Sequence, residues 1–174
     1  MINHYKFKFR NFWEHKKPGI LDNKFGVTGK YKIKIINKDT GLIENEEINN
    51  RIMDDVLDEL IKVLQGTATD LEIKYLALGT DNTAITDTDA ALGAEIFRVA
   101  LTDITKTGTG ELTSLAIVLD SEAVDTIEEI GIFAGAAATA AADSGTLVSR
   151  ILWTRIKSSS EELQFTRIDT IVRG

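Results

Sequence analysis

Residues 30–48 read KYKIKIINKDTGLIENEEI, and this stretch decides the fold class. Tyr31, Ile33 and Ile35 alternate with lysines, a period of two that places one face of a β-strand in a core and the other in solvent. The segment NKDTG has the composition of a turn, and LIENEEI returns as a second strand. The stretch therefore predicts an antiparallel hairpin.

The second half of the chain continues the β pattern. Short apolar runs are separated by turns that are rich in glycine, threonine, serine and aspartate. Strands are predicted near residues 72–78, 95–105, 111–119, 126–134, 146–156 and 162–172. Many strands at short spacing predict a mainly β protein, with an antiparallel β-sandwich or a barrel-like body. The low-complexity segment GAAATAAADSG, which ends at Gly145, favours a flexible loop over a short helix because it has a glycine at each end.

One segment, at about residues 50–65, has a helical period instead. Its apolar residues are Ile52, Val56, Leu60, Ile61 and Leu64. Asn49 or Asn50 can cap the start of this amphipathic helix, and Asp54 and Asp55 suit the positive end of its dipole. Gly66 can end it.

The composition indicates a single globular domain, or one domain with an appendage. The chain has 174 residues, 43% of them hydrophobic, and one proline. The absence of cysteine excludes disulfides, thiolate zinc sites and cysteine nucleophiles. No apolar run has the length of a signal peptide or a membrane span, so we expect a protein that is made, and used or assembled, in the cytoplasm.

The net charge of −7 conceals a division along the chain. Residues 1–38 carry ten Lys/Arg against Glu14 and Asp22, whereas residues 39–174 carry ten Lys/Arg against 25 Asp/Glu. The first part also holds seven of the twelve aromatic residues. This asymmetry predicts a basic aromatic arm over residues 1–30 and a β-rich structural domain over residues 31–174.

The arm contains the candidate interface residues. The segment HYKFKFRNFW places rings on one strand face and basic groups on the other. The interface is predicted to comprise Tyr5, Lys6, Phe7, Lys8, Phe9, Arg10, Phe12 and Trp13. A nucleic-acid strand would need stacking and phosphate contact from one side, so this pattern disfavours nucleic acid. We favour an arm that docks on a sheet edge of another chain, and a first strand of the domain itself remains an alternative.

Three carboxylates lie in the stretch YLALGTDNTAITDTDAALGAEIFR, residues 75–98. Asp81, Asp87 and Asp89, with Asn82, could offer oxygen ligands to calcium. Their spacing matches no EF-hand loop, and the same residue types form turns without any metal. We therefore favour a connection between two strands over a metal site.

Catalytic constellations are not evident in the sequence. Histidine occurs only at His4 and His15, both in the basic segment. The glycines of residues 108–110 precede a strand rather than the helix that a phosphate site requires. The acidic pairs at residues 128–129 and 161–162 point to opposite strand faces and cannot cooperate as acid and base. We expect no cofactor, no catalytic residue and no enzymatic activity.

Three segments, taken in order, carry a family resemblance. They are LALGT with ALGAEIFR (residues 76–98), TIEEIGIFAG (residues 126–135) and GTLVSRILWTRIKSSSEELQFTRIDTIV (residues 145–172). With the hairpin and helix before them, they resemble small β-rich structural proteins of tailed bacteriophages and related contractile particles, of the tail-fibre-like, baseplate or minor structural kind. The resemblance covers residues 31–172.

The resemblance implies a role in assembly rather than turnover. It implies a virion structural protein of the tail or baseplate, located in the particle, whose partners are other virion proteins and further copies of itself. A capsid or neck decoration protein and a receptor- or carbohydrate-binding module remain alternatives. The glycines Gly79 and Gly93 would bracket a structural loop, and Gly131 would allow a bend or a close approach. The loop ends would be anchored in the core by Leu76, Leu78, Leu92, Ile96 and Phe97.

Overall fold

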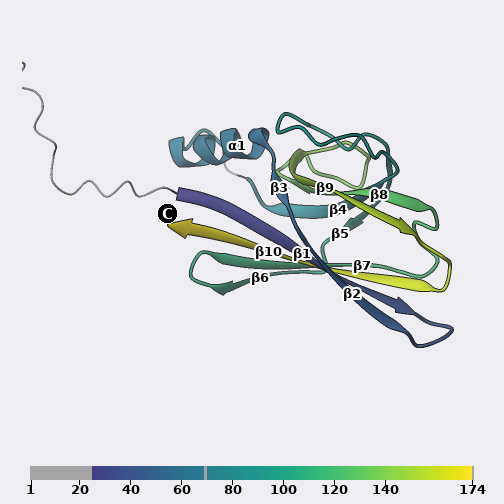
Figure 1. Cartoon of the computed structure of the whole chain (residues 1–174). Coiled ribbons are helices and arrows are strands. Elements are labelled where there is room, and N and C mark those ends of the chain that lie inside the picture. Colours follow the sequence, from purple (N-terminus) through teal and green to yellow (C-terminus); the bar gives the residue numbers. More distant parts are fainter. Residues whose placement is uncertain (1–24, 69, 174) are drawn as a thin grey trace, which may run out of the picture.

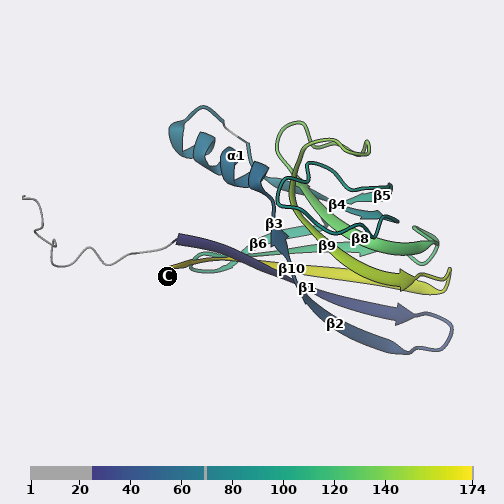
Figure 2. The ribbon, with the colours of Figure 1, turned by 45° about the horizontal axis from the view of Figure 1, so that its top comes forward.

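A computed structural model describes residues 25–68 and 70–173 of the chain. In this part of the chain, two five-stranded antiparallel sheets face each other and one helix lies at their end (Figures 1 and 2). The sheets do not close into a barrel. The predicted β-sandwich with one helix is confirmed, and the barrel alternative is not.

Each sheet has a simple strand order. The first sheet runs β2 (Ile43–Asn49), β1 (Phe25–Asn37), β10 (Glu161–Arg173), β7 (Glu111–Val118) and β6 (Asp103–Gly108). The second sheet runs β3 (Arg51–Ile52), β9 (Thr146–Ile156), β8 (Thr126–Ala134), β4 (Ile73–Gly79) and β5 (Glu95–Ala100). The helix α1 (Asp54–Gln65) follows β3.

The predicted hairpin forms as β1 and β2. Ile36 lies opposite Ile43 across the turn, and Tyr31, Ile33 and Ile35 are buried between the sheets. On its other side β1 pairs with β10 along its whole length, so the first and last strands of the described chain lie side by side. Residues 25–30, which the charge pattern assigned to the arm, belong to this paired strand.

The prediction of one strand over residues 95–105 is wrong. β5 ends at Ala100 in the second sheet, and β6 begins at Asp103 in the first. The chain crosses between the sheets at the two residues that join them. There the Leu101 amide donates to the Lys74 carbonyl of the second sheet, and the Thr102 amide to the Leu115 carbonyl of the first. The sequence does not mark this crossing. Both β5 and β6 are edge strands, and the pattern of apolar residues continues from one to the other without a break.

The predicted helix is confirmed, but its predicted cap is wrong. The N-cap residue is Met53, which makes no capping side-chain hydrogen bond, and the predicted caps Asn49 and Asn50 precede β3. Asp54 and Asp55 lie in the first turn as expected. The helix ends at Gly66, whose φ of 73° is left-handed and favours glycine.

Two apolar clusters hold the body together. The larger lies between the sheets and contains the inner faces of the long strands, including Leu76, Leu78 and Ile132. The smaller lies on the outer face of the second sheet, where Ala77 and Phe133 point because side chains alternate along a strand. Loops 80–94 and 135–145 cover this outer face (Figure 2). The second sheet is therefore buried on both of its faces.

The loop anchors agree with the expectation except at one position. Leu76 and Leu78 are buried between the sheets, Leu92 is buried in the outer cluster, and Phe97 packs half-buried against the core. Ile96 is 42% exposed and does not anchor the loop, because it lies on the face of the edge strand β5 opposite to that of Phe97. Gly131 lies beneath Leu92, whose methyl group would be 2.8 Å from a Cβ there.

Candidate functional site

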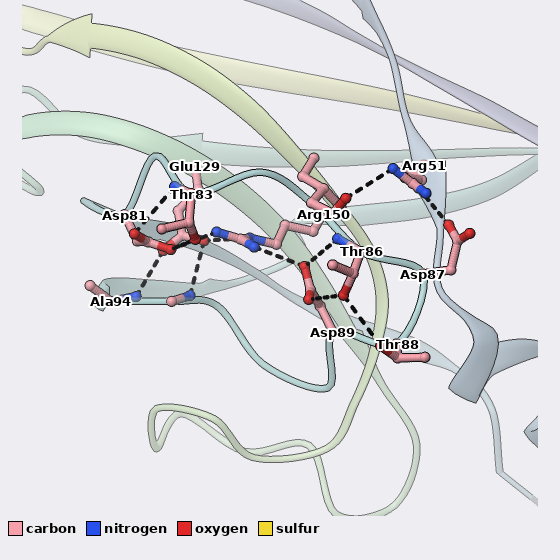
Figure 3. A network of polar contacts seen from close by, with 12 residues as sticks. Arg51, Asp81, Thr83, Thr86, Asp87, Thr88, Asp89, Ala94, Glu129 and Arg150 are labelled. Atoms are coloured by element: carbon pink, nitrogen blue, oxygen red, sulfur yellow. Dashed lines mark hydrogen bonds and ion pairs between the residues drawn. The ribbon is translucent and has the colours of Figure 1, made fainter.

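Loop 80–94 is held by a buried arginine, Arg150 of β9 (Figure 3). Its Nε donates to Glu129 of the adjacent strand β8 at 2.7 Å. Its Nη1 donates to Asp89 at 2.8 Å, and its Nη2 donates to Asp81 at 2.9 Å. The Arg150 side chain is only 4% exposed. One guanidinium thus joins two carboxylates of the loop to a third in the sheet.

Glu129 is the innermost group of this network. Its side chain is fully buried, and besides Arg150 it accepts hydrogen bonds from the backbone amides of Gly93 (3.1 Å) and Ala94 (2.9 Å). The donors satisfy a charge that would otherwise be costly to bury. Sequence reasoning assigned Glu129 only to a non-cooperating acidic pair and did not find this role.

Gly79 and Gly93 leave space for the carboxylates of Glu129 and Asp81, because glycine has no side chain. A Cβ at Gly93 would be within 1.9 Å of an Asp81 oxygen, and a Cβ at Gly79 would be within 2.3 Å of a Glu129 oxygen. Both distances are far below any van der Waals contact. The expectation that these glycines are structural therefore has a specific cause, which is the close approach of the Asp81 and Glu129 side chains.

The remaining loop contacts fix each aspartate separately. Hydrogen bonds from Thr83, together with Arg150, hold the pKa of Asp81 below its usual value. Burial raises the pKa of Asp89, but hydrogen bonds from Thr86 and Arg150 outweigh it and lower the pKa. Asp87 pairs with Arg51 of β3 at the surface, and this hydrogen bond lowers its pKa.

The three aspartates considered as candidate calcium ligands, Asp81, Asp87 and Asp89, are therefore partnered by arginine and threonine. Asp81 and Asp89 meet at Arg150, whereas Asp87 turns to Arg51 (Figure 3). Within residues 25–68 and 70–173, no group of three or more acidic or histidine side chains has an arrangement that could hold a metal ion. The contacts seen here serve to fasten the loop.

A second arginine fastens the alanine-rich loop 135–145. Arg98 of β5 donates to the carbonyl of Ser144 at 2.7 Å and to that of Thr139 at 3.2 Å. It also forms a two-bond ion pair with Glu95, and its guanidinium carbon lies 3.9 Å from the centre of the Phe133 ring. The loop contains no helix, as predicted. The hydrogen bonds that hold this loop to the buried Arg98 could not be predicted from the sequence.

The helix α1 presents a second kind of site, an apolar face that the described chain leaves uncovered. None of its residues is buried. Four large side chains are exposed, and they are Leu57, Ile61, Val63 and Leu64. Leu64 alone is 76% exposed. A helix with so many exposed apolar groups is unusual on a monomer, and apolar patches of this kind are typical of interaction surfaces.

Beside this face lies an apolar groove of about 380 Å³, which we call the α1 groove. Its helix wall is formed by Val56, Leu57 and Leu60, and its opposite wall includes Val27 of β1 and Ile171 of β10. Figure 2 shows α1 standing apart from the near ends of β1, β10 and β6, and the groove lies in this region. Both sheets contribute to it.

The base of the groove contains a buried charged pair. Arg167 donates to Asp169 at 2.6 Å and is only 2% exposed. Its Nε and Nη1 have no hydrogen-bond partner among the residues that the structure describes, and its guanidinium carbon lies 5.9 Å from the centre of the Tyr31 ring. Burial raises the pKa of Asp169. Because these polar atoms are sealed from the groove, its accessible surface is almost wholly apolar.

The predicted interface residues Tyr5, Lys6, Phe7, Lys8, Phe9, Arg10, Phe12 and Trp13 lie outside the described residues. The described chain begins at the first residue of β1. β1 starts at Phe25, and Val27, two residues further, is part of the α1 groove (Figure 1). The arm therefore joins the body at the groove end.

Comparison with known proteins adds no relative. No protein-family model, no curated protein and no solved structure matches the chain. No helix in the described part is long and apolar enough to cross a membrane.

Proposed function

We propose that this protein is a non-enzymatic structural component of a virus particle, in the tail or baseplate, which acts by assembly of subunits. The three segments described above, with their resemblance to structural proteins of tailed bacteriophages, support the particle and the location. The uncovered apolar face of α1 is the observation that supports assembly, because a soluble monomer rarely exposes a contiguous apolar patch without a partner for it.

The exposed area of this face indicates how much free energy its burial contributes to association. Leu57, Ile61 and Leu64 are 44%, 53% and 76% exposed. Full burial of such a side chain contributes roughly 1.5–3 kcal/mol, so covering the exposed parts of all three contributes about 3–5 kcal/mol. Association costs about 4–15 kcal/mol in lost freedom of motion. The helix face alone is therefore insufficient, and a second contact is needed.

The N-terminal arm supplies that second contact. Its rings offer apolar area, and its basic groups are attracted to the acidic body of a neighbouring subunit. The edge strands are poor substitutes. β2 carries Glu44, Glu46 and Glu47, and such charges discourage pairing between sheet edges. The arm is thus the principal joining element, and the edges are secondary.

Deletion of residues 1–17 tests this proposal. The truncated protein should keep the far-ultraviolet circular dichroism and melting temperature of the body but be missing from purified particles. Two matched full-length variants separate the two faces of the arm. Replacing Tyr5, Phe7 and Phe9 by serine should abolish incorporation, whereas replacing Lys6, Lys8 and Arg10 by glutamine should only reduce it. Truncated protein present in particles at the normal level would refute the role of the arm.

A further inference from the structure

We propose that the α1 groove is the receptor for residues 4–13 of a neighbouring copy of the chain. This inference rests on the proposed function, and it names the surface to which the arm binds. The contact would be head-to-tail, with each copy giving one arm and receiving another.

The size and chemistry of the groove fit the rings of the arm. A cavity of about 150 Å³ accommodates one benzene ring, so 380 Å³ has room for about two rings. In an extended strand Phe7 and Phe9 would share one face, with their backbone positions about 6.6–6.8 Å apart. The accessible walls are largely apolar, because the Nε and Nη1 atoms of Arg167 are buried. An aromatic side chain is therefore a better occupant than a polar or anionic small molecule.

Charge favours the same occupant. Residues 1–24 carry six Lys/Arg against Glu14 and Asp22, a balance of +4. The helix α1 carries Asp54, Asp55, Asp58 and Glu59 against Lys62, a balance of −3. When the rings of a strand point into the groove, its basic residues point away from the groove floor, where they remain solvated beside the acidic helix. Opposite charges also steer the arm toward the groove.

The length of the arm indicates where the neighbouring copy lies. The eleven residues 14–24 join the ring segment to β1 and span at most about 36–40 Å when extended. A compact body of this size has a radius of gyration of about 15 Å and is about 38 Å across. The arm leaves its own body at the end that carries the groove. It therefore reaches the groove of a second copy only when the two bodies lie beside each other with these ends level. The copies therefore stand side by side in a ring or helical array.

A sheet edge is the competing receptor, and the structure disfavours it. The edge strand β6 has the sequence DITKTG, and five of its six residues are exposed. An added strand would gain backbone hydrogen bonds there but would find threonine, lysine and aspartate rather than an apolar pocket for its rings. Unlike the β6 edge, the groove offers burial for the aromatic face.

Photo-crosslinking of the full-length protein tests the inference. A benzophenone amino acid replaces Phe9, and unlabelled and ¹⁵N-labelled chains are mixed in urea and refolded together. Peptide mapping should show crosslinks from position 9 to Leu57, Leu60 or Ile171, with mixed-isotope pairs about as frequent as same-isotope pairs. The same amino acid at position 8, on the opposite strand face, is the matched control and should not label the groove.

Each other result overturns the inference. Crosslinks to β2 or β6 would identify a sheet edge as the receptor. Groove crosslinks found only within same-isotope pairs would show that each arm occupies its own groove. Absence of crosslinks between copies, with a monomeric protein in solution, would show that the groove does not join subunits.

A pair of glutamate variants gives an independent measurement. Leu60→Glu places a charge in the groove wall and should weaken self-association at least about tenfold in sedimentation equilibrium, since one buried ring contributes more than that factor. Leu42→Glu changes an exposed leucine in the turn after β1, at the far end of the body, and should leave self-association unchanged (Figure 1). Equal association of the two variants would overturn the inference.

The two proposals fail in distinguishable ways. If deletion of residues 1–17 prevents entry into particles but crosslinks avoid the groove, only the receptor assignment is wrong. If the truncated protein still enters particles, the assembly role of the arm is wrong whatever the crosslinks show.

Discussion

Replacing the buried Arg150 by methionine should destabilise the protein more than any other single charged-to-apolar change in loop 80–94 or its contacts. Methionine keeps much of the aliphatic length but removes all three charged donors. Glu129 then keeps only its two backbone donors, from Gly93 and Ala94. The aspartates that Arg150 also holds are 19–22% exposed and can turn toward solvent. The cost is therefore concentrated on one fully buried carboxylate.

The expected loss of unfolding free energy follows from leaving this one buried carboxylate without its charged partner. Removal of one partner from a buried ion pair typically costs about 3–5 kcal/mol, and the two remaining amide donors place the expected loss near the lower value. For a domain of this size each kcal/mol lowers the melting temperature by roughly 2–4 °C, so a loss of about 3 kcal/mol lowers it by about 6–12 °C. Such a loss is a large part of the total stability of an ordinary domain.

Urea unfolding, followed by tryptophan fluorescence and by circular dichroism, measures the loss. Arg51→Met is the matched control, because Arg51 pairs with Asp87 of the same loop but both side chains are about half exposed, at 48% and 53%. Its effect should be small. Glu129→Gln added to Arg150→Met removes the unpaired charge and should restore about 1–3 kcal/mol. The reasoning is refuted if Arg150→Met loses less than about 1 kcal/mol, or no more than Arg51→Met.

Three further predictions follow from neighbouring contacts. Gly93→Ala should cost about 1–3 kcal/mol in urea unfolding because its Cβ meets Asp81, whereas Gly108→Ala, whose Cβ has no neighbour closer than 3.5 Å, should be nearly neutral; equal effects would contradict the steric account. Asp89 has a lowered folded pKa, so its stabilisation is present above its unfolded pKa of about 3.9 and is lost as the pH falls through the folded value. Asp89→Asn should therefore lose less stability than the wild type between pH 5 and pH 2, each relative to its own value at neutral pH, and an unchanged pH profile would exclude this linkage. Arg98→Met should speed amide hydrogen exchange in residues 139–144 about tenfold, while unaltered protection would show that the loop needs no clamp.

The strands could be predicted because their signal is local. The alternation of Tyr31, Ile33 and Ile35 is written in consecutive residues, and the positions of β7, β8, β9 and β10 agree with the apolar runs to within a residue. The crossing at residues 101–102 could not be predicted in the same way. It depends on which sheet each strand joins, and this is decided by partners far away in the chain.

The Arg150 network shows why polar sites are harder to predict. Glu129 is 21 residues from Arg150, and Asp81 is 69 residues away, so no short motif contains them. The sequence did contain one usable signal, the glycines at positions 79 and 93 beside an acidic loop. Their structural role was predicted, but the carboxylates that require them could be named only once the strands were paired.

The α1 groove was missed for a different reason. The helical period of residues 52–64 was recognised, and an amphipathic helix normally buries its apolar face on its own body. Here the face remains largely exposed, since Leu57, Ile61 and Leu64 are 44%, 53% and 76% exposed. Periodicity identifies the apolar face of a helix but does not identify what covers it.

The central claim, that the protein is part of a tailed particle, is tested most directly by locating it there. A tag is placed at the C-terminus, cells that produce the particles are induced or infected, and purified particles are labelled with gold against the tag for electron microscopy. The account predicts label at the end of the tail or along it, and label on the head would favour a decoration protein. Protein found only in the soluble fraction, and never with particles, would contradict the account.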